Sequence, residues 1–303
     1  MNIVILGPTA VGKTKVSIEI AQRINAEIIY SDSVAIYKGM DIGSAKPSSK
    51  ERSLVTHHLI DIKYPNESFS SGEFVSSVTK IIRDIKKKGK AVLISGSSGF
   101  YIDSLIFGID KIESVDEKVK NFFDDICLEF SPYYLYKFLQ VIDRKWSDKI
   151  DKNDCQRIKR GLSVYIDKNR ELSNLFSRKR KQSNDFQIFV LYASKEFIDK
   201  RIEQRVDLMI ENGLIDEVQN LIKQGYISSK PLQSIGYKET IMYLNNEIDK
   251  RQLSEMIKKN TKAYAKRQMT LLRSKFNKAV WIDIENENPI DAILTRLYPY
   301  KHL

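Results

Sequence analysis

The stretch "NIVILGPTAVGKT", residues 2 to 14, decides the fold. Its first part, residues 2–6, is a continuous apolar run, which is typical of a strand buried on both faces of a parallel sheet. Residues 7–14 match G-x-x-x-x-G-K-[ST], the pattern of a phosphate-binding loop. Apolar residues at helical spacing follow, so the loop stands between a strand and a helix, as the motif requires. We therefore expect a di- or triphosphate ligand at this helix N-terminus.

The residue types of the loop suit such an anion. Gly7 and Gly12 let backbone N–H groups converge on phosphate oxygens, and the helix N-terminus adds its partial positive charge. Lys13 would supply a point charge, and Thr14 a hydroxyl ligand for Mg²⁺. The residues expected at the phosphates are Gly7, Pro8, Thr9, Ala10, Val11, Gly12, Lys13 and Thr14.

Further apolar runs recur along the chain at the spacing of βαβ units, with an amphipathic helix predicted over residues 73–90. The expected strands are "AEIIYS" (26–31), "AVLISGSSG" (91–99), "FQIFVLYA" (186–193) and "AVWIDI" (279–284). This alternation predicts an α/β fold, with a parallel sheet flanked by helices.

Strand signals vanish between residues 111 and 185, where charged helical segments end in the basic run "SRKRK" (177–181). We expect a smaller, all-helical insertion domain there. Residues 1–110 and 186–303 then form the phosphate-binding core, ending in basic helices.

The composition of the chain indicates the kind of binding partner and the cellular compartment to expect. The net charge is +11 and the isoelectric point about 9.3, which makes a polyanionic partner worth testing. Cys127 and Cys155 stand in no metal spacing, so a reducing compartment is the simplest interpretation. No apolar run approaches the roughly 18 residues of a membrane span, and no basic leader precedes residues 2–6. We expect a cytoplasmic monomer.

Asp32 follows the second predicted strand, so it should lie beside the phosphate loop, at the carboxyl edge of the sheet where ligands of open α/β folds bind. An ATPase of this architecture carries an acidic residue at the end of a later strand, but residues 91–99 end in Ser and Gly. This weakens a nucleotide-hydrolysis interpretation and favours substrate chemistry at Asp32. Asp32 could otherwise hold Mg²⁺ through water or cap a turn.

Seven motifs together resemble the tRNA dimethylallyltransferase family over about residues 2–275. They are "GPTAVGKT", "SDSVAIYKGMDIGSAKP", "HHLIDI", "GSSGFYI", "NDCQRIKRGL", "QSIGYKE" and "YAKRQMTLLR". The resemblance implies that the loop binds dimethylallyl diphosphate rather than ATP, with Mg²⁺, and that the insertion clamps a tRNA anticodon stem-loop. The implied reaction prenylates the adenine immediately 3′ of the anticodon.

The resemblance also implies roles for single residues. Asp32 maps onto the general base, with Thr9, Ser98 and Arg205 at the reacting centre. The residues expected at the tRNA are Asp32, Ser33, Val34, Ala35, Ser98, Lys120, Gln156, Arg157, Ile158, Lys159, Arg160, Gly236, Tyr237, Lys238, Lys262, Lys266 and Arg267.

Several positions depart from the family pattern, and "TLLR" (270–273) lacks the common aromatic pair. Ser97 replaces a glycine, and Ser98 replaces a threonine whose hydroxyl faces the substrate. Lys262 stands where arginine is usual, and Asp151 where histidine is frequent. The hydroxyl at position 98 survives, so the family resemblance holds.

Arg201 and Arg205 could add charge at the diphosphate, although an ordinary solvated helix face is the simpler interpretation of these arginines. At 100° per residue, a one-signed stripe follows the C-terminal helix, which favours a surface that tracks RNA phosphates. Its members are Lys259, Lys262, Lys266 and Arg273. His57 and His58 are adjacent on an extended segment and point to opposite faces, so we expect packing and hydrogen bonding from them rather than metal binding.

Three other functions remain open. A small-molecule P-loop kinase would hold ATP in the loop and use Asp32 as its base, but this function gives no role to the insertion or the basic tail. An isopentenyltransferase acting on free adenine nucleotides fits the loop, but "QRIKR" (156–160) argues against it. A nucleic-acid-binding module explains the basic stripe and leaves Asp32 unused.

Overall fold

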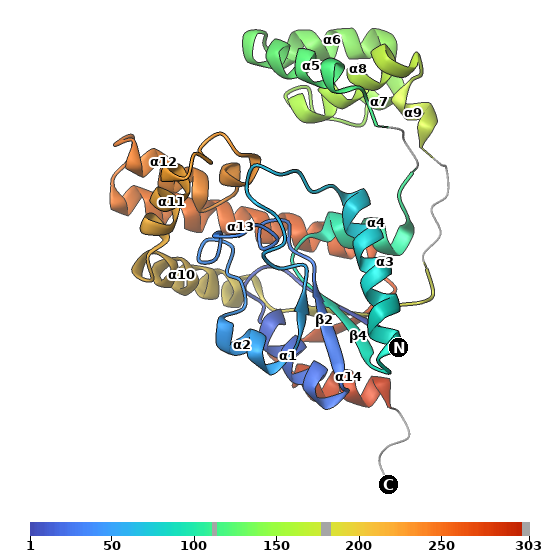
Figure 1. Cartoon of the computed structure of the whole chain (residues 1–303), viewed down its shortest axis with the longest axis vertical. Helices are drawn as coiled ribbons and strands as arrows, with labels where there is room; N and C mark the ends of the chain where they lie inside the picture. Colours follow the sequence, from blue (N-terminus) through green and yellow to red (C-terminus); the bar gives the residue numbers. More distant parts are fainter. Residues whose placement is uncertain (111–113, 177–182, 299–303) are drawn as a thin grey trace. The chain divides into compact units, whose positions relative to one another are not determined.

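A parallel six-stranded sheet forms the centre of the larger of two structural units (Figure 1). The computed structural model describes residues 1–110, 114–176 and 183–298. The strands are β1 (Asn2–Leu6), β2 (Ala26–Tyr30), β3 (His57–His58), β4 (Ala91–Ser95), β5 (Gln187–Tyr192) and β6 (Val280–Asp283). Their order is β3-β2-β4-β1-β5-β6, and every pair is parallel. The predicted α/β fold is confirmed.

Helices flank this sheet, and further helices of the same unit pack against those. They are α1 (Lys13–Arg23), α2 (Ser49–Leu54), α3 (Ser71–Lys87), α4 (Gly99–Phe107), α10 (Lys195–Glu211), α11 (Leu214–Lys223), the 3₁₀ turn η1 (Lys230–Gln233), α12 (Tyr237–Leu244), α13 (Lys250–Lys275) and α14 (Pro289–Leu297). In β1, Ile3 and Ile5 join the main hydrophobic core, while Val4 on the other face is equally buried. A strand buried on both faces must be apolar at every position, which explains the continuous run at residues 2–6.

Two long helices begin at capping boxes. Ser70 and Glu73 exchange side-chain to backbone hydrogen bonds at the start of α3, and Asp249 and Gln252 do the same at α13. Each box satisfies two backbone N–H groups that the first turn would leave without partners.

The chain divides into residues 1–106 with 183–303, and residues 107–182. The second unit holds α5 (Glu117–Glu129), α6 (Pro132–Ile142), α7 (Arg144–Ser147), α8 (Cys155–Lys168) and α9 (Leu172–Leu175). Phe123, Leu135, Leu139, Ile158 and Leu162 form its core. The basic run at 177–181 lies outside the described residues.

Two further features concern the cysteines and the helices. Cys155 is disulfide-bonded, which differs from the reduced state that the cysteine spacing led us to expect. The side chain of Cys127 lies outside the described part of the structure. Among the described residues, no helix combines the length and the apolar character needed to cross a membrane.

The two histidines hydrogen-bond, as expected. The Nδ1 atom of His57 lies 2.8 Å from the carbonyl oxygen of Val55, and Nε2 of His58 lies 2.8 Å from Glu27. The extended pair is the short edge strand β3, which sequence analysis did not recognise as a strand because its residues are polar and few.

Candidate active site

Strand register brings Asp32 and Ser97 together. Tyr30 pairs with Ser95 across β2 and β4, so the residues two positions further along the two chains leave the sheet side by side. The Asp32 carboxylate accepts hydrogen bonds at Oδ1 from the backbone N–H groups of Val34, at 2.9 Å, and Ala35, at 3.1 Å. Its other oxygen, Oδ2, accepts a short hydrogen bond from the Ser97 hydroxyl. Asp32 therefore caps the turn after β2 and also reaches the loop after β4.

The phosphate loop follows β1, which lies between β4 and β5. Gly7 must be glycine because a Cβ there would lie 2.5 Å from the carbonyl oxygen of Leu191. Gly12 adopts a left-handed conformation at φ 99°, and no side chain caps the helix α1 that begins after it. Ala10 also has a positive φ of 65°. An uncapped helix N-terminus behind a tight loop is the geometry that binds phosphate.

Lys13 is buried beneath this loop. Its ammonium donates hydrogen bonds to the carbonyl oxygens of Gly7, at 2.9 Å, and Pro8, at 2.7 Å. Burial, and after it the nearby Arg205 charge, lower the pKa of Lys13 to about 7, while the Asp32 charge opposes the shift. The site thus holds a lysine that an arriving anion would stabilise in its charged form.

Helix α10 brings Arg205 to the loop, where its guanidinium donates a hydrogen bond of 3.3 Å to the Thr9 hydroxyl. Burial, and to a lesser extent Arg201, lower the pKa of Arg205, while Tyr30 opposes them. Within the described residues, no carboxylate forms an ion pair with Arg205. The interpretation of this position as a solvated helix face is therefore wrong, because a half-buried arginine without a counter-ion needs an anion from outside the chain.

Gln268 of α13 joins the two functional loops. Its side-chain oxygen accepts a hydrogen bond from the backbone N–H of Thr9, and its nitrogen donates to the carbonyl oxygen of Ser97, both at 2.8 Å. The side chain is only 7% exposed. Tyr264, one turn earlier, interacts with Ser97 and Gln268, and both oppose the rise of its pKa that burial causes. Sequence analysis missed Gln268, Tyr264 and Ser97 as site residues, because nothing local shows which loops α13 will cross.

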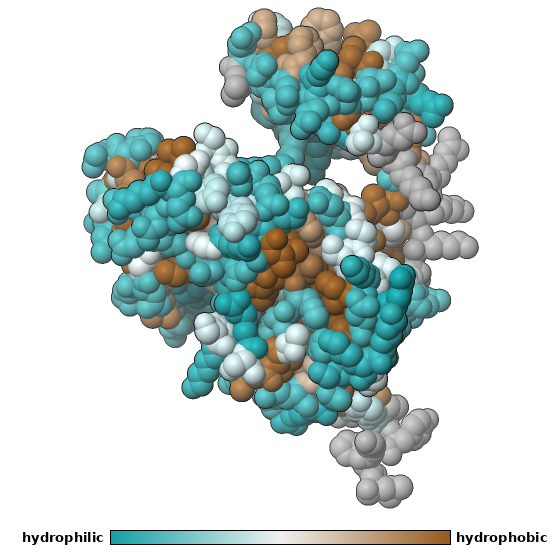
Figure 2. Space-filling model, viewed as in Figure 1, coloured by the Kyte–Doolittle hydropathy of each residue, from teal (hydrophilic) through white to brown (hydrophobic). Residues whose placement is uncertain are grey.

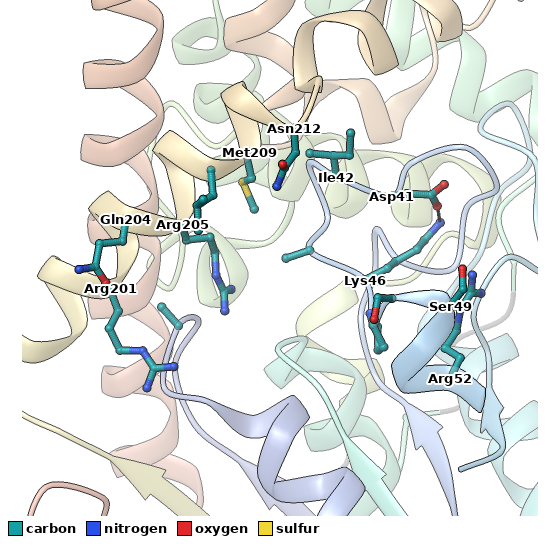
Figure 3. Close-up of a pocket in the computed structure, with 15 residues that line it drawn as sticks. Asp41, Ile42, Lys46, Ser49, Arg52, Arg201, Gln204, Arg205, Met209 and Asn212 are labelled. Atoms are coloured by element: carbon teal, nitrogen blue, oxygen red, sulfur yellow. Dashed lines mark hydrogen bonds and ion pairs between the residues drawn. The ribbon is translucent and has the colours of Figure 1, made fainter. Parts of the chain in front are cut away.

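Two cavities meet at this point. One, of about 320 Å³, contains Thr9, Asp32, Ser97 and Arg205 together with apolar side chains. The apolar residues are Val34, Val206, Met209, Ile235 and Ile257. The other, of about 580 Å³, has α10 on one wall and the segment around Lys46 and Arg52 on the other (Figure 3). Ala45, Arg205 and Met209 line both cavities, so the two are adjacent.

The segment at residues 41–43, which borders the larger cavity, is held by Glu217 of α11. The Glu217 carboxylate accepts backbone N–H hydrogen bonds from Asp41, at 2.9 Å, Ile42, at 2.7 Å, and Gly43, at 3.1 Å. It also accepts one from the Tyr237 hydroxyl at 2.7 Å. A glycine is required at position 43, because a Cβ there would lie 2.5 Å from the Tyr237 ring.

The Gly43→Ala variant should therefore lower the free energy of unfolding by about 1–3 kcal/mol, the typical cost of overpacking a filled site. Denaturant unfolding of the whole chain measures this change. Gly72→Ala is the matched control, because position 72 lies in α3 with its nearest neighbour atom at 3.7 Å and should be neutral or slightly stabilising. Equal stabilities of the two variants would contradict the packing argument.

The structure buries four side chains that were expected at the tRNA. Tyr237 is 0% exposed and donates to Glu217, Ala35 is 0% exposed, and Ile158 lies in the core of the smaller unit. These side chains therefore pack the fold and do not present themselves to an RNA. Ser98 is also buried, and its hydroxyl accepts a hydrogen bond of 2.8 Å from the Ser33 N–H, so it is Ser97 that faces the smaller cavity.

Other expected tRNA residues are exposed, half-buried or part of the lining of the smaller cavity. Ser33 and Lys238 are exposed, and Val34 and Gly236 line the smaller cavity. In the smaller unit, Lys120, Gln156 and Arg157 are exposed, while Lys159 and Arg160 are half-buried. Arg157 pairs with Asp154 at 2.6 Å, and Lys159 with Asp124. Burial lowers the pKa of Arg160.

The basic stripe on α13 is less one-signed than its sequence indicates. Lys262 pairs with Glu203 of α10 at 2.6 Å, and Lys258 pairs with Asp207 at 2.5 Å. Leu253 and Ile257 are buried on the opposite side of the helix. The expectation of an unneutralised stripe was wrong at Lys262, because the carboxylate that pairs with it comes from the neighbouring helix α10, which the α13 sequence does not show. Lys266 and Arg267 are exposed.

The donor set around the loop fits a magnesium ion held mainly by phosphate oxygens and water. Thr14 places one hydroxyl at the start of α1, beside Tyr30. Within the described residues, no group of three or more His, Cys, Asp or Glu side chains could hold a metal by itself. Mg²⁺ commonly keeps several waters and is bound through substrate phosphates, so a single protein hydroxyl is sufficient.

Comparison with known proteins agrees with this geometry. A family model described as IPP transferase matches residues 35–275. The tRNA dimethylallyltransferase of Acetivibrio thermocellus is 38% identical over 302 residues, covering 98% of this chain and 96% of that relative. That of Pseudothermotoga lettingae is 39% identical over 297 residues, covering 97% and 93%.

Solved structures give the same result. The tRNA delta(2)-isopentenylpyrophosphate transferase of Staphylococcus epidermidis matches with a TM-score of 0.72 and 34% identity, covering 98% of this chain and 99% of that one. A eukaryotic dimethylallyltransferase acting on tRNA matches with a TM-score of 0.80 and 26% identity, covering 98% and 77%. The family model spans most of this chain, and the relatives match it over nearly their whole length. The chain therefore belongs to the IPP transferase family.

Proposed function

We propose that this enzyme transfers the dimethylallyl group of dimethylallyl diphosphate to N6 of the adenine immediately 3′ of the anticodon in tRNA. The observation that carries the proposal is a carboxylate and an unneutralised cationic site facing one cavity. Asp32 lies on one side, and Arg205 with Thr9 of the phosphate loop on the other. Such a cavity can hold a nucleophile that loses a proton and a leaving group that gains charge.

The cationic side suits a diphosphate. Lys13 and Arg205 lie beneath and beside the loop, and Arg201 extends from α10 into the adjoining cavity (Figure 3). Lys13 and Arg205, with the N-terminus of α1, stabilise the charge that develops on the diphosphate as it departs, while Arg201 contributes to diphosphate binding. Bound Mg²⁺ at Thr14 would supply further charge neutralisation. The apolar side chains of the smaller cavity, among them Val206 and Ile257, give a water-poor surface for the five-carbon group.

The reaction then balances in one step. The N6 nitrogen forms a bond to C1 of the dimethylallyl group, the bond between C1 and the diphosphate oxygen breaks, and diphosphate leaves with the electron pair. The N6 proton passes to the carboxylate of Asp32. Because the lone pair of an adenine amine is delocalised into the ring, a carboxylate that orients the amine and accepts its proton lowers the barrier.

The acceptor base must leave its stack before N6 can reach this cavity, and unstacked bases are found in RNA loops. The exposed cations Lys266 and Arg267 on α13, and Lys120 and Arg157 in the smaller unit, are the groups that we assign to tRNA phosphates.

The kinase alternative is not favoured. β4 ends at Ser95 and is followed by Gly96, so this strand places no carboxylate at a magnesium ion beside the loop. The proposal is tested by incubating the wild-type chain with labelled dimethylallyl diphosphate and tRNA, AMP or no acceptor. Transfer to tRNA alone supports it, and transfer to AMP would indicate a nucleotide prenyltransferase. ATP hydrolysis without prenyl transfer would overturn it.

Lys13 gives the donor site a pH dependence. With a pKa near 7 in the empty site, Lys13 is mostly neutral at pH 8, and a bound diphosphate favours its charged form. Binding of dimethylallyl diphosphate should therefore take up a proton, and its affinity should fall by up to about tenfold per pH unit above 7. The same depressed pKa makes the empty protein more stable as pH rises from about 7 towards 10, since the unfolded chain binds more protons there.

Calorimetric titration at pH 8, in two buffers of different ionisation enthalpy, counts the protons taken up. Lys13→Met, which cannot titrate, is the control and should take up none at position 13. Proton uptake of equal size in both proteins would show that another group is responsible.

A further inference from the structure

The two oxygens of the Asp32 carboxylate are not equivalent. A carboxylate offers about four acceptor positions, two on each oxygen. The N–H groups of Val34 and Ala35 both bond to Oδ1, while among the described residues Oδ2 receives only the Ser97 hydroxyl. The acceptor position that remains open is therefore on Oδ2, in a residue that lines the smaller cavity. This oxygen is the one available to an incoming proton.

Ser97 is itself held firmly. Its carbonyl oxygen accepts a hydrogen bond of 2.8 Å from Gln268, and its position relative to Asp32 follows from the pairing of Tyr30 with Ser95. The preceding Gly96 packs so closely that a Cβ there would lie 2.0 Å from the carbonyl oxygen of Ser31. The Ser97 hydroxyl thus reaches Asp32 from a backbone that is fixed on both sides.

We propose that Ser97 is a positioning residue, whose hydroxyl fixes the Asp32 carboxylate so that the open acceptor position of Oδ2 faces the amine. The inference rests on the proposed function, in which Asp32 is the base. Family resemblance leads one to expect glycine at this position, so the hydrogen bond from Ser97 to Asp32 is a feature of this chain's own sequence. Without the hydroxyl, the carboxylate keeps its two bonds at Oδ1 but can turn about them, and fewer encounters place Oδ2 at the proton.

The test uses the full chain with dimethylallyl diphosphate and tRNA, and measures kcat and both KM values. Ser97→Ala should lower kcat on the order of tenfold and change each KM by less than about twofold. Ser97→Thr keeps the hydroxyl and should restore kcat to within about threefold of the wild type. Ser95→Ala is the matched control, because the Ser95 hydroxyl bonds to Ser17 of α1 at 2.7 Å and not to Asp32.

Single-turnover rates of a double variant separate positioning from a general effect on the fold. In the Asp32→Asn background, Ser97→Ala should lower the rate by less than about twofold more, since its partner no longer acts as a base. A full tenfold loss in that background, or wild-type kcat in Ser97→Ala, would overturn the inference. A tenfold loss in the Ser95→Ala control would also count against it. The wild-type reaction in the same series tests the proposed function. If the wild type transfers no prenyl group to tRNA, the proposed function and the role of Ser97 are both contradicted.

Discussion

Replacing Asp32 with asparagine should lower kcat on the order of 10²- to 10⁴-fold, the usual effect of removing a general base, with nearly unchanged affinity for tRNA and dimethylallyl diphosphate. The variant suits the site. The amide oxygen of asparagine can accept the hydrogen bonds of Val34 and Ala35, and its nitrogen can donate to the Ser97 oxygen. The hydrogen bonds are kept, while the negative charge and the capacity to take a proton are lost.

This experiment also separates catalysis from turn capping, which the structure shows Asp32 to perform. If Asp32 acted only through the turn, Asp32→Asn would lose stability or diphosphate affinity in proportion to rate. Single-turnover rates at saturating substrates, together with a denaturation curve, decide between the two. A variant that reacts at wild-type speed once loaded would exclude Asp32 as the base.

The second large effect is expected at Arg205. Arg205→Met should lower kcat on the order of 10²- to 10³-fold, because it removes a donor aimed at the charge that develops on the leaving diphosphate. The same substitution should leave the free energy of unfolding of the empty protein unchanged or raised. Arg205 is half-buried without a carboxylate partner among the described residues, and a charge in that setting is costly to the fold.

Arg201→Met is the matched control, one helical turn away on α10. Arg201 lines only the larger cavity, whereas Arg205 lines both and contacts Thr9. We expect Arg201→Met to weaken diphosphate binding by less than about tenfold and to leave kcat within about threefold. Equal losses of kcat in the two variants would show that the reaction responds to the general positive potential and not to a contact at Thr9.

On the face shown in Figure 2, the surface is mostly hydrophilic, with hydrophobic side chains gathered in the middle of the larger unit. The spacing of hydrophobic residues along the sequence already indicated which segments would be buried. Strands β1, β4 and β5 were predicted as continuous apolar runs, and the capping residues Ser70 and Asp249 stand where their helices begin. Local steric and hydrogen-bonding preferences are sufficient for such elements.

The position of Asp32 was predictable for a similar reason. A residue that follows a parallel strand must appear at the carboxyl edge of the sheet, and the phosphate loop after β1 appears at the same edge. The motif Gly7 to Thr14 needs no distant partner to be recognised, because its glycines and its lysine act through the backbone of the same loop.

Other features depended on residues far apart in the chain. Sequence spacing alone could not show that Glu203 would neutralise Lys262, or that Tyr237 would be buried against residues 41–43. Nor could it show Arg205 half-buried beside Thr9, 196 positions away. The sequence by itself determined the phosphate loop, the parallel sheet and the location of Asp32, because short-range backbone geometry and strand order specify them. Only the tertiary structure decided which hydroxyl holds Asp32 and which cations stay unpaired, because those contacts arise where α10, α13 and the loop after β4 pack together.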